Sequence, residues 1–370
     1  MGELQRTVLY DLHKEYGAKM VPFAGWDMPV QFASGVMKEH LHTRAEAGLF
    51  DVSHMAQVIL RGDDAARALE ALVPVDVIGL KPGRQRYAMF TTPEGGLLDD
   101  LMIANKGDHL FLVLNAARRD VDLAHLHANL SGLEVEEITG RALVALQGPK
   151  AEAVLAALNP AVRDMRFMDV ADLELAGATC WVSRSGYTGE DGFEISVPNT
   201  MAPRLARALL DDPRVQPIGL GARDSLRLEA GLCLYGSDID ETTTPAEADL
   251  GWAIQKVRRP GGAREGGFPG ADRILAELTD GTERRRVGLA PDGRAPMRAG
   301  TQLFADEDGA EPIGSITSGA FGPSIERPMS MGYVPAGMAK PGTRLFGDVR
   351  GKRLPVSVAE LPFHPHTYKR

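Results

Sequence analysis

The feature that most constrains this chain is residues 95–103, in which two adjacent carboxylates lie inside an otherwise apolar run. Turn signals rich in Gly, Pro and Asn stand on both sides of it, at residues 92–96 and 105–108. Further apolar segments flank these turns. The pattern therefore predicts an antiparallel meander of three strands with an acidic pair in its middle strand.

The alternation of side chains along that strand separates the two acids. Asp99 faces one side of the sheet with Leu101, whereas Asp100 faces the other side. At least one acid points into apolar surroundings, where an unpaired carboxylate costs several kcal/mol or becomes protonated. Two interpretations are open from these residues: a structural acid that accepts backbone N–H bonds, or a functional acid with a ligand or a cationic partner.

Length and charge restrict the class of protein. A chain of 370 residues is too long for one ordinary core, so we expect two or three domains. A net charge of -9, together with the lack of any stripe of Lys and Arg, argues against a nucleic-acid partner. The sequence has no run of 18 apolar residues and no apolar signal core near residue 1, so we expect no membrane span and a cytoplasmic location.

Metal sites and common catalytic motifs are not indicated. Cys180 and Cys233 lack the spacing of metal ligands, and we interpret them as reduced, buried thiols. The histidine pairs at 40/42 and 125/127 are two residues apart, which on a helix places the side chains about 200° apart. His54 is open to two interpretations, an acid/base group or a core histidine. The chain also lacks a phosphate-binding Gly-Lys-Ser loop and a Gly-x-Ser-x-Gly elbow.

A predicted hairpin carries a candidate binding acid. Residues 178–185 and 193–197 form its strands, and alternation puts Glu194 on the face opposite Phe193 and Ile195. Glu194 is either an ordinary solvated edge residue or an acid that faces a ligand.

Two predicted helices complete this set. Residues 221–230 place Arg223 and Arg227 four apart on one helix face. Such a pair forms local salt bridges or binds a carboxylate or a polar ring edge bidentately. Residues 116–130 predict a second helix with Asn115 as its N-cap. Beyond residue 283, short strands separated by Gly and Pro predict a small all-β domain.

Six motifs in one order closely resemble the glycine cleavage system T-protein family of aminomethyltransferases. They are Phe23-Ala24-Gly25-Trp26, Phe50-Asp51-Val52-Ser53-His54-Met55, Gly96-Leu97-Leu98-Asp99-Asp100-Leu101, Ala145-Leu146-Gln147-Gly148-Pro149, Gly186-Tyr187-Thr188-Gly189-Glu190-Asp191-Gly192 and the run from Ala222 to Leu232. The resemblance extends over residues 9–368.

The resemblance implies an α+β, three-domain, cloverleaf-like folate-binding transferase fold with antiparallel sheets and a C-terminal all-β barrel-like domain. It further implies discontinuous first and second domains. We expect residues 1–50, about 140–175 and about 225–275 in the first domain, residues 51–139 and about 176–224 in the second, and residues 283–370 in the third.

The implied reaction moves an aminomethyl group from the lipoyl arm of H protein to tetrahydrofolate. The products are 5,10-methylenetetrahydrofolate, ammonia and dihydrolipoyl H protein. Tetrahydrofolate is thus implied as co-substrate and lipoylated H protein as partner, and neither a metal nor a flavin is implied.

The resemblance also assigns residues of this sequence to roles. Asp100 matches the catalytic acid, which leaves Asp99 a structural role. Glu194 matches the acid that binds the pterin, Arg223 a ligand-binding arginine, and Tyr368 a tyrosine that closes the site. The predicted apolar or stacking walls of the folate site are Met55, Tyr87, Tyr187 and Trp252.

Two alternatives share the implied fold. One is a tetrahydrofolate-dependent demethylase, such as dimethylsulfoniopropionate demethylase, and the other is a non-catalytic folate-binding protein of iron–sulfur assembly. The acidic pair with residues 186–194 favours transfer chemistry. The Lys-Gly-Cys-x-x-Gly-Gln-Glu signature of the assembly proteins is absent from this sequence.

Overall fold

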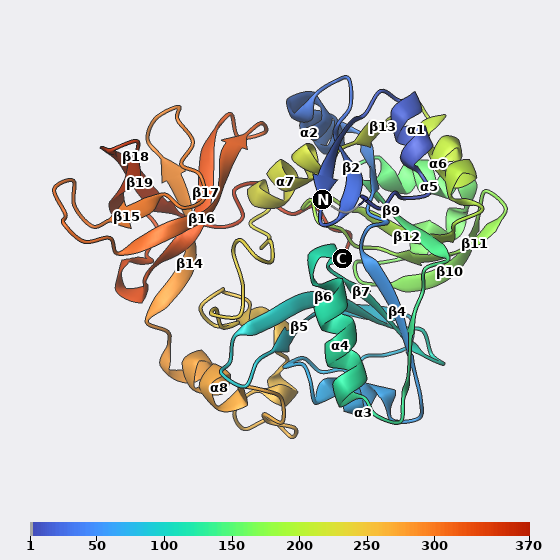
Figure 1. The fold of residues 1–370 in the computed structure, drawn as a ribbon, viewed down its shortest axis with the longest axis horizontal. Coiled ribbons are helices and arrows are strands. Elements are labelled where there is room, and N and C mark those ends of the chain that lie inside the picture. The colour runs from blue at the N-terminus through green and yellow to red at the C-terminus, as the bar shows by residue number, and fades with distance from the viewer. Residues whose placement is uncertain (1–2) are drawn as a thin grey trace.

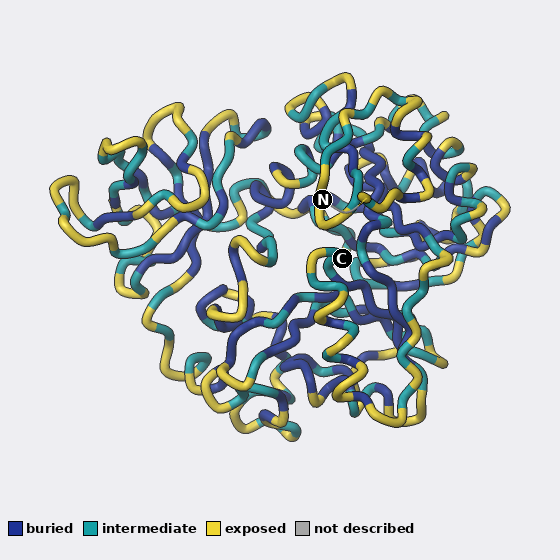
Figure 2. The backbone as a smooth tube through the Cα atoms, viewed as in Figure 1, coloured by how far each residue is buried: buried dark blue, intermediate teal, exposed yellow. Residues whose placement is uncertain are grey.

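Two large open β-sheets and one closed barrel organise the chain in this computed structural model, which describes residues 3–370 (Figure 1). A further sheet has two antiparallel strands, β1 (Lys19–Phe23) and β2 (Trp26–Gln31). The barrel lies to the left in Figure 1, and the two large sheets lie one above the other on the right. Buried backbone follows the strands and exposed backbone follows the loops (Figure 2). Within residues 3–370, every helix is too short or too polar to cross a membrane.

The first sheet has the order β10-β11-β12-β9-β3-β13. Its strands are β3 (Ala47–Asp51), β9 (Arg141–Gln147), β10 (Val170–Leu175), β11 (Ala178–Ser183), β12 (Gly192–Pro198) and β13 (Val215–Ile218). Helices α1 (Tyr10–Glu15), α5 (Ala151–Leu158) and α6 (Ala202–Leu210) cover one face of it. Period-two alternation sends Val144 and Leu146 of β9 to that face and Leu143 and Ala145 to the other.

The second sheet has the order β5-β6-β7-β4-β8 and contains the predicted meander. Its strands are β4 (Ala56–Arg61), β5 (Arg84–Thr91), β6 (Leu97–Asn105), β7 (Leu110–Leu114) and β8 (Glu134–Glu137). Helices α3 (Ala65–Glu70) and α4 (Arg119–Asn129) contribute to the core on one face, where Leu126 of α4 meets Leu97 and Leu101.

The uncovered faces of the two sheets meet in a separate apolar cluster. Ala104, Phe111 and Val113 of the second sheet pack there with Leu143 and Ala145 of the first. Helix α7 (Leu220–Glu229) closes one side of this cluster through buried apolar residues. Side chains on the inner faces of both sheets therefore point toward one common region.

The C-terminal part is a closed barrel with the order β14-β17-β16-β15-β18-β19. Its strands are β14 (Arg284–Pro291), β15 (Gln302–Phe304), β16 (Gly314–Gly322), β17 (Arg327–Pro335), β18 (Arg344–Val349) and β19 (Lys352–Ala359). The predicted fold class is confirmed, with one qualification. Among the named strands of residues 3–370, β13 and β3 form a parallel pair, whereas the other pairs are antiparallel.

The sheets also bear on the domain boundaries. Strands β11 and β12 hydrogen-bond within the first sheet, next to β10 and β9. In contrast, Ile239, Leu250 and Phe268, together with helix α8 (Ala271–Asp280), contribute to the core of the second sheet. We therefore propose a division that differs from our sequence-based one, with residues 176–224 in the first domain and about 233–280 in the second.

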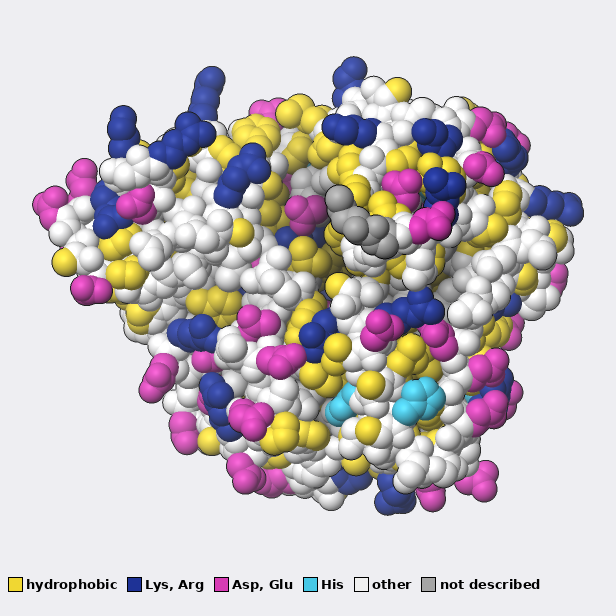
Figure 3. Space-filling view, in the orientation of Figure 1, with side chains coloured by type: hydrophobic (Ala, Val, Ile, Leu, Met, Phe, Trp, Pro, Cys, Tyr) yellow, Lys and Arg dark blue, Asp and Glu magenta, His cyan; other side chains and the backbone are white. Residues whose placement is uncertain are grey.

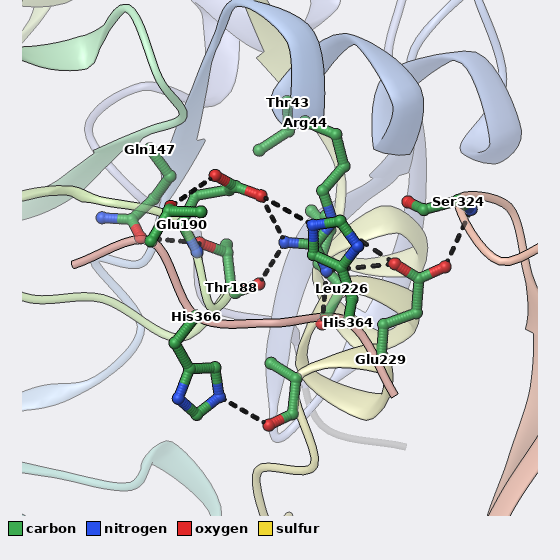
Figure 4. A network of polar contacts seen from close by, with 12 residues as sticks. Thr43, Arg44, Gln147, Thr188, Glu190, Leu226, Glu229, Ser324, His364 and His366 are labelled. Atoms are coloured by element: carbon green, nitrogen blue, oxygen red, sulfur yellow. Dashed lines mark hydrogen bonds and ion pairs between the residues drawn. The ribbon is translucent and has the colours of Figure 1, made fainter. Parts of the chain in front are cut away.

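A buried polar network joins α7 to the rest of the molecule (Figure 4). Arg44, from helix α2 (Val36–Ala45), donates to Glu190 at 2.9 Å and to Glu229 at 3.1 Å. The carboxylate of Glu229 also contacts the ring of His40 at 3.0 Å and accepts the backbone N–H of Ser324 at 2.8 Å. Because Ser324 belongs to the barrel domain, this carboxylate connects the barrel to the first sheet.

The C-terminal tail follows the same network into the centre of the molecule, where Figure 1 marks the C-terminus. The backbone of His364 donates to the Glu229 carbonyl at 2.9 Å, and that of Thr367 donates to the Gly189 carbonyl at 2.9 Å. The tail therefore lies against the loop between β11 and β12.

The protonation state of Glu229 matters for stability. Burial alone would raise the pKa of Glu229, but the hydrogen bond and charge of His40, aided by Ser324 and Arg44, hold it at about 2 instead of the usual 4.5. A depressed carboxyl pKa stabilises the folded state above the unfolded-state pKa. That contribution is lost as pH falls from about 4.5 through 2.

We expect Glu229→Gln to lower the free energy of unfolding by about 3 kcal/mol, because it removes one charge from a buried ion network. Urea unfolding at pH 7 measures this loss, and repeating it below pH 4.5 should show a smaller difference between variant and wild type. Glu15→Gln is the matched control, since Glu15 pairs with Arg207 on the surface. Equal unfolding midpoints for both variants would contradict the central role of Glu229.

Candidate functional site

The acidic pair lies on β6, the middle strand of the meander. Its alternation is as predicted: Asp99 is fully buried, and Asp100 is partly exposed on the face that looks toward the first sheet. The turn before the strand is pressed against a loop, since a Cβ on Gly96 would lie 1.8 Å from the carbonyl oxygen of Glu241. Only glycine fits this contact, which fixes the start of the strand.

Two donors hold the side chain of Asp100. The hydroxyl of Tyr87, on neighbouring β5, donates to its Oδ2 at 2.9 Å. The side-chain amide of Asn115, which follows β7, donates to its Oδ1 at 2.7 Å and to Asp99 Oδ1 at 3.0 Å. The three strands of the meander therefore supply the acid and both donors.

The surroundings of Asp100 bring the pKa of its carboxyl group close to neutral pH. Burial, followed by the charge of Asp99, raises the pKa of Asp100 to about 7, while the hydrogen bonds from Tyr87 and Asn115 oppose the rise. A carboxyl group that titrates near neutrality can exist in either protonation state at working pH. This property suits a group that takes part in proton transfer or stabilises a developing cation.

An aromatic pair lies beside the acid. The rings of Tyr87 and Trp252 stack with centroids 5.6 Å apart and an interplanar angle of 24°. Trp252 is 64% exposed, which is unusual for so large an apolar side chain. The pair therefore forms an open aromatic surface next to Asp100.

Glu194 faces the same inter-sheet region from β12. It lies opposite Ser183 in the β11–β12 register and accepts a hydrogen bond from the hydroxyl of Ser185 at 3.3 Å. It lines a small cavity with residues of both sheets, among them Phe111 and Trp181. Burial raises the pKa of Glu194, and the charge of Arg223 opposes the rise.

The two arginines of α7 have different environments. Arg227 is fully engaged: it donates to Asp238 at 2.6 Å, to Asp224 at 2.9 Å and to Ser318 of the barrel at 2.8 Å. Arg223 instead has a buried Nη1 with no hydrogen-bond partner among residues 3–370. An unpartnered buried donor is costly, so Arg223 is the one of the pair that is free to bind a ligand.

Tyr187 connects Arg223 to the rest of the site. The guanidinium of Arg223 lies over the Tyr187 ring, 4.9 Å from its centroid, and the Tyr187 hydroxyl donates to the backbone carbonyl of Cys233. Burial raises the pKa of Tyr187 well above its ordinary value, with the charge of Asp100 adding to the rise. The Tyr187 hydroxyl therefore stays protonated and neutral, close enough to Asp100 for the two groups to interact electrostatically.

His54 contributes a second unpartnered atom near Arg223. Its Nδ1 is buried without a hydrogen-bond partner among residues 3–370. Burial lowers the pKa of His54 to about 4, with the positive charge of Arg223 adding to the effect and Asp51 opposing it. A neutral imidazole is a poor general acid, so the geometry favours a packing or polar-contact role over acid/base chemistry.

Met55 and Tyr368 occupy the margins of the site. Met55 is partly buried against the cluster between the two sheets. Tyr368 stacks on Phe167 with centroids 4.1 Å apart, and burial raises its pKa to about 12. The structure thus places Tyr368 on the tail beside the loop that precedes β12, and among residues 3–370 its hydroxyl forms no hydrogen bond to Asp100 or Glu194.

Two residues of this site are not identified by the sequence pattern. Asn115 occupies the predicted N-cap position, before the short 3-10 helix Ala116–Arg118 that leads into α4, but its side chain forms no capping hydrogen bond and bonds the acidic pair instead. Asp122 of α4 is fully buried against the same pair. The available sequence signal is its position four residues before buried Leu126, on the apolar face of the helix.

Comparisons with known proteins match both parts of this architecture. A family model described as "GCVT N-terminal domain" matches residues 9–258, and one described as "Glycine cleavage T-protein C-terminal barrel domain" matches residues 284–364. The chain belongs to the glycine cleavage T-protein family.

Individual relatives agree along the whole chain. The mitochondrial aminomethyltransferase of Dictyostelium discoideum is 44% identical over 100% of this chain and 94% of its own. That of Homo sapiens is 46% identical over 99% of this chain and 91% of its own. A crystal structure of glycine cleavage system aminomethyltransferase T from Bartonella henselae superposes with a TM-score of 0.93 at 45% identity, and each chain is covered completely.

These comparisons confirm the predicted family, fold and function: the chain is an aminomethyltransferase of the glycine cleavage system. They also correct one expectation. The cytoplasmic location is contradicted by relatives such as those of Dictyostelium discoideum, Mus musculus and Homo sapiens, which are named as mitochondrial enzymes. The lack of a signal core near residue 1 was therefore a poor guide to compartment.

The donor from Tyr87 gives a prediction about pH dependence. Tyr87→Phe removes a hydrogen bond that favours ionised Asp100 and keeps the aromatic stack on Trp252. The pKa of Asp100 should rise above about 7, so the acid limb of kcat/KM for aminomethyl transfer should move up by about one pH unit. Tyr10→Phe, far away on α1, is the control. An unmoved acid limb in Tyr87→Phe would show that Asp100 does not govern it.

Proposed function

We propose that Asp100 is the catalytic carboxylate of an aminomethyl transfer from lipoylated H protein to tetrahydrofolate. The reaction breaks both the C–S bond and the C–N bond of the aminomethyl group on the lipoyl arm, and N5 and N10 of the folate bond to the carbon in their place. The protons of these two nitrogens end on the dihydrolipoyl thiol and on ammonia, so the products are 5,10-methylenetetrahydrofolate, ammonia and the reduced arm.

The observation that carries this proposal is the environment of Asp100. Its carboxyl is oriented by Tyr87 and Asn115, titrates near neutrality and faces the region where two sheets meet. As the C–S bond breaks, positive charge develops on the aminomethyl carbon and nitrogen. A fixed carboxylate in a water-poor site stabilises that charge without reorganisation and orients the attacking nitrogen.

We assign the folate-binding role to Glu194 and Arg223. The aminopyrimidine edge of a pterin presents two parallel N–H donors, which a carboxylate accepts bidentately. Glu194 lies in a cavity between the sheets, and the positive charge of Arg223 favours its ionised form. The unpartnered Nη1 of Arg223 would donate to a polar group of the same ligand. Buried groups with missing partners on the ligand-free protein fit a site that a polar ligand completes.

The remaining predicted walls are proposed with roles that follow from their positions. Tyr87 and Trp252 offer a stacking surface beside Asp100, and Tyr187 holds Arg223 in place through its ring. Met55 supplies apolar contact between the sheets. Tyr368 lies at the edge of the site, where its ring stacks on Phe167. We assign it a contact with bound folate from the C-terminal tail, made only when the folate is present.

We expect Asp100→Asn to lower turnover by on the order of a hundredfold or more while tetrahydrofolate binding is retained, because the amide keeps the shape of the side chain and loses the charge. The assay supplies aminomethyl-loaded H protein and tetrahydrofolate and follows ammonia release. Asp108→Asn, at an exposed turn, is the matched control. Wild-type rates for Asp100→Asn would refute the assignment, and methyl transfer from a sulfonium compound without ammonia would indicate a demethylase.

Glu194→Gln should weaken tetrahydrofolate binding about tenfold to a hundredfold, since a bond between a charged acceptor and two donors is replaced by a neutral amide that also presents a clashing N–H group. Quenching of intrinsic Trp fluorescence by tetrahydrofolate measures the affinity. The exposed Glu360→Gln serves as control. An affinity equal to that of the wild type would remove Glu194 from the binding site.

A further inference from the structure

Two fully buried acids remain without an explanation in the structure described so far. Asp99 and Asp122 both have side chains with 0% exposure. Within residues 3–370, Asp99 Oδ2 and both carboxyl oxygens of Asp122 have no donor bonded to them. Burial of two ionised carboxylates that together accept one hydrogen bond, from Asn115 to Asp99 Oδ1, is strongly unfavourable, because the other oxygens lose their hydration without a compensating partner.

The two acids lie against each other. Asp99 points from β6 into the core beneath the second sheet, and Asp122 lies in the first turn of α4, the helix that packs on that core. Their carboxyl groups are within hydrogen-bonding reach. Two carboxylates can only accept hydrogen bonds, so a bond between them requires a proton on one of them.

Within residues 3–370, no cation forms a hydrogen bond with the unbonded oxygens of these two acids. The charge of Arg118 favours the ionised form of both, but its Nη2 donates to Glu241 at 2.9 Å, its guanidinium lies over the ring of Tyr235, 5.1 Å from the centroid, and its Nε has no partner. The other titratable groups that face the cluster are Asp100, Tyr87 and Tyr235, with Tyr187 and Cys233 behind them. None of these is positively charged at neutral pH.

We propose that Asp99 and Asp122 share one proton, carried by Asp122, and that protonated Asp122 is a positioning residue for Asp100. The O–H of Asp122 donates to Asp99 Oδ2, whose other oxygen accepts the amide of Asn115 at 3.0 Å. The same amide donates to Asp100 Oδ1 at 2.7 Å. A continuous chain of hydrogen bonds thus runs from the helix to the acid that we assign to catalysis.

The direction of titration agrees with this arrangement. Burial raises the pKa of Asp122, and the bond to Asp99 adds to the rise. Burial also raises the pKa of Asp99, but there the bond from Asp122 opposes the rise. The proton therefore belongs on Asp122, which leaves Asp99 as the charged neighbour that raises the pKa of Asp100.

The shared proton stands on the geometry of Asp99 and Asp122 alone, whereas the positioning role rests on the proposed function of Asp100. Infrared spectra test the first part without any assay. A wild-type minus Asp122→Asn difference spectrum, recorded at pH 9 where Asp100 is ionised, should contain the C=O stretch of a protonated carboxyl group. The same difference taken on an Asp100→Asn background should retain that band. A spectrum without the band would overturn the shared proton.

Kinetics test the second part. Asp122→Leu should lower kcat about tenfold and leave the KM for tetrahydrofolate nearly unchanged, because Asp99 loses its donor and no longer fixes Asn115. Asp99 would then be protonated and neutral, so its charge would no longer raise the pKa of Asp100. The acid limb of the pH profile would therefore move to lower pH. Asp122→Asn should restore most of kcat and the wild-type acid limb, since its amide donates to Asp99 as a protonated carboxyl does.

Each outcome decides between alternatives. If Asp122→Asn moves the acid limb down as far as Asp122→Leu does, Asp122 is ionised in the wild type and the proposal fails. If Asp122→Leu does not fold, the asparagine variant and the infrared band still decide the protonation state. If Asp100→Asn proves active while the band is present, the shared proton stands, and the proposed function of Asp100 and the positioning role fail together.

Discussion

The arrangement of the domains depends on the buried charged side chains of helix α7. These side chains form ion pairs and hydrogen bonds with both the first domain and the barrel. Glu229 at the end of α7 holds Arg44 and His40 of the first domain together with the barrel backbone at Ser324. Two residues earlier, Arg227 donates to Asp238 and to Ser318 of the barrel. One turn before Arg227, Arg223 faces the candidate site, and its Nη1 has no hydrogen-bond partner among residues 3–370. Removal of one partner from such a network leaves an uncompensated buried ion, so the three bodies hold each other in one arrangement.

The acidic strand β6 poses a related problem, because buried negative charges there also need partners. Three carboxyl groups, those of Asp99, Asp100 and Asp122, lie close together, and among residues 3–370 none of them forms an ion pair with a cation. Protein can keep such a cluster only through hydrogen-bond donors and retained protons. Tyr87 and Asn115 donate hydrogen bonds to Asp100. In the arrangement that we propose, Asp99 and Asp122 together carry one negative charge, because Asp122 keeps its proton. The result is an acid that titrates near neutrality at a fixed position.

Much of this organisation is predictable from local pattern. The turns at both ends of residues 95–103 and the apolar alternation between them predict the meander and the opposite orientations of Asp99 and Asp100, and the structure confirms both. The barrel beyond residue 283 is also confirmed. The roles of Asn115 and Asp122 are not predictable in this way. A local pattern assigns Asn115 to a helix cap, because an asparagine before a helix is normally a cap, and only strand pairing brings it to the acids.

The sequence by itself determined the strands, the faces on which the acids and arginines lie, and the family, because these depend on residue order and on short-range periodicity. The tertiary structure alone decided which polar groups are paired. It engaged Arg227 and left Arg223 free, and it placed Glu194 and Asp100 on facing sheets. It also united residues 141–147 and 178–198 in one sheet. The physical reason is that the pKa and the hydrogen-bonding of a buried group depend on neighbours distant in sequence, and folding alone brings these together.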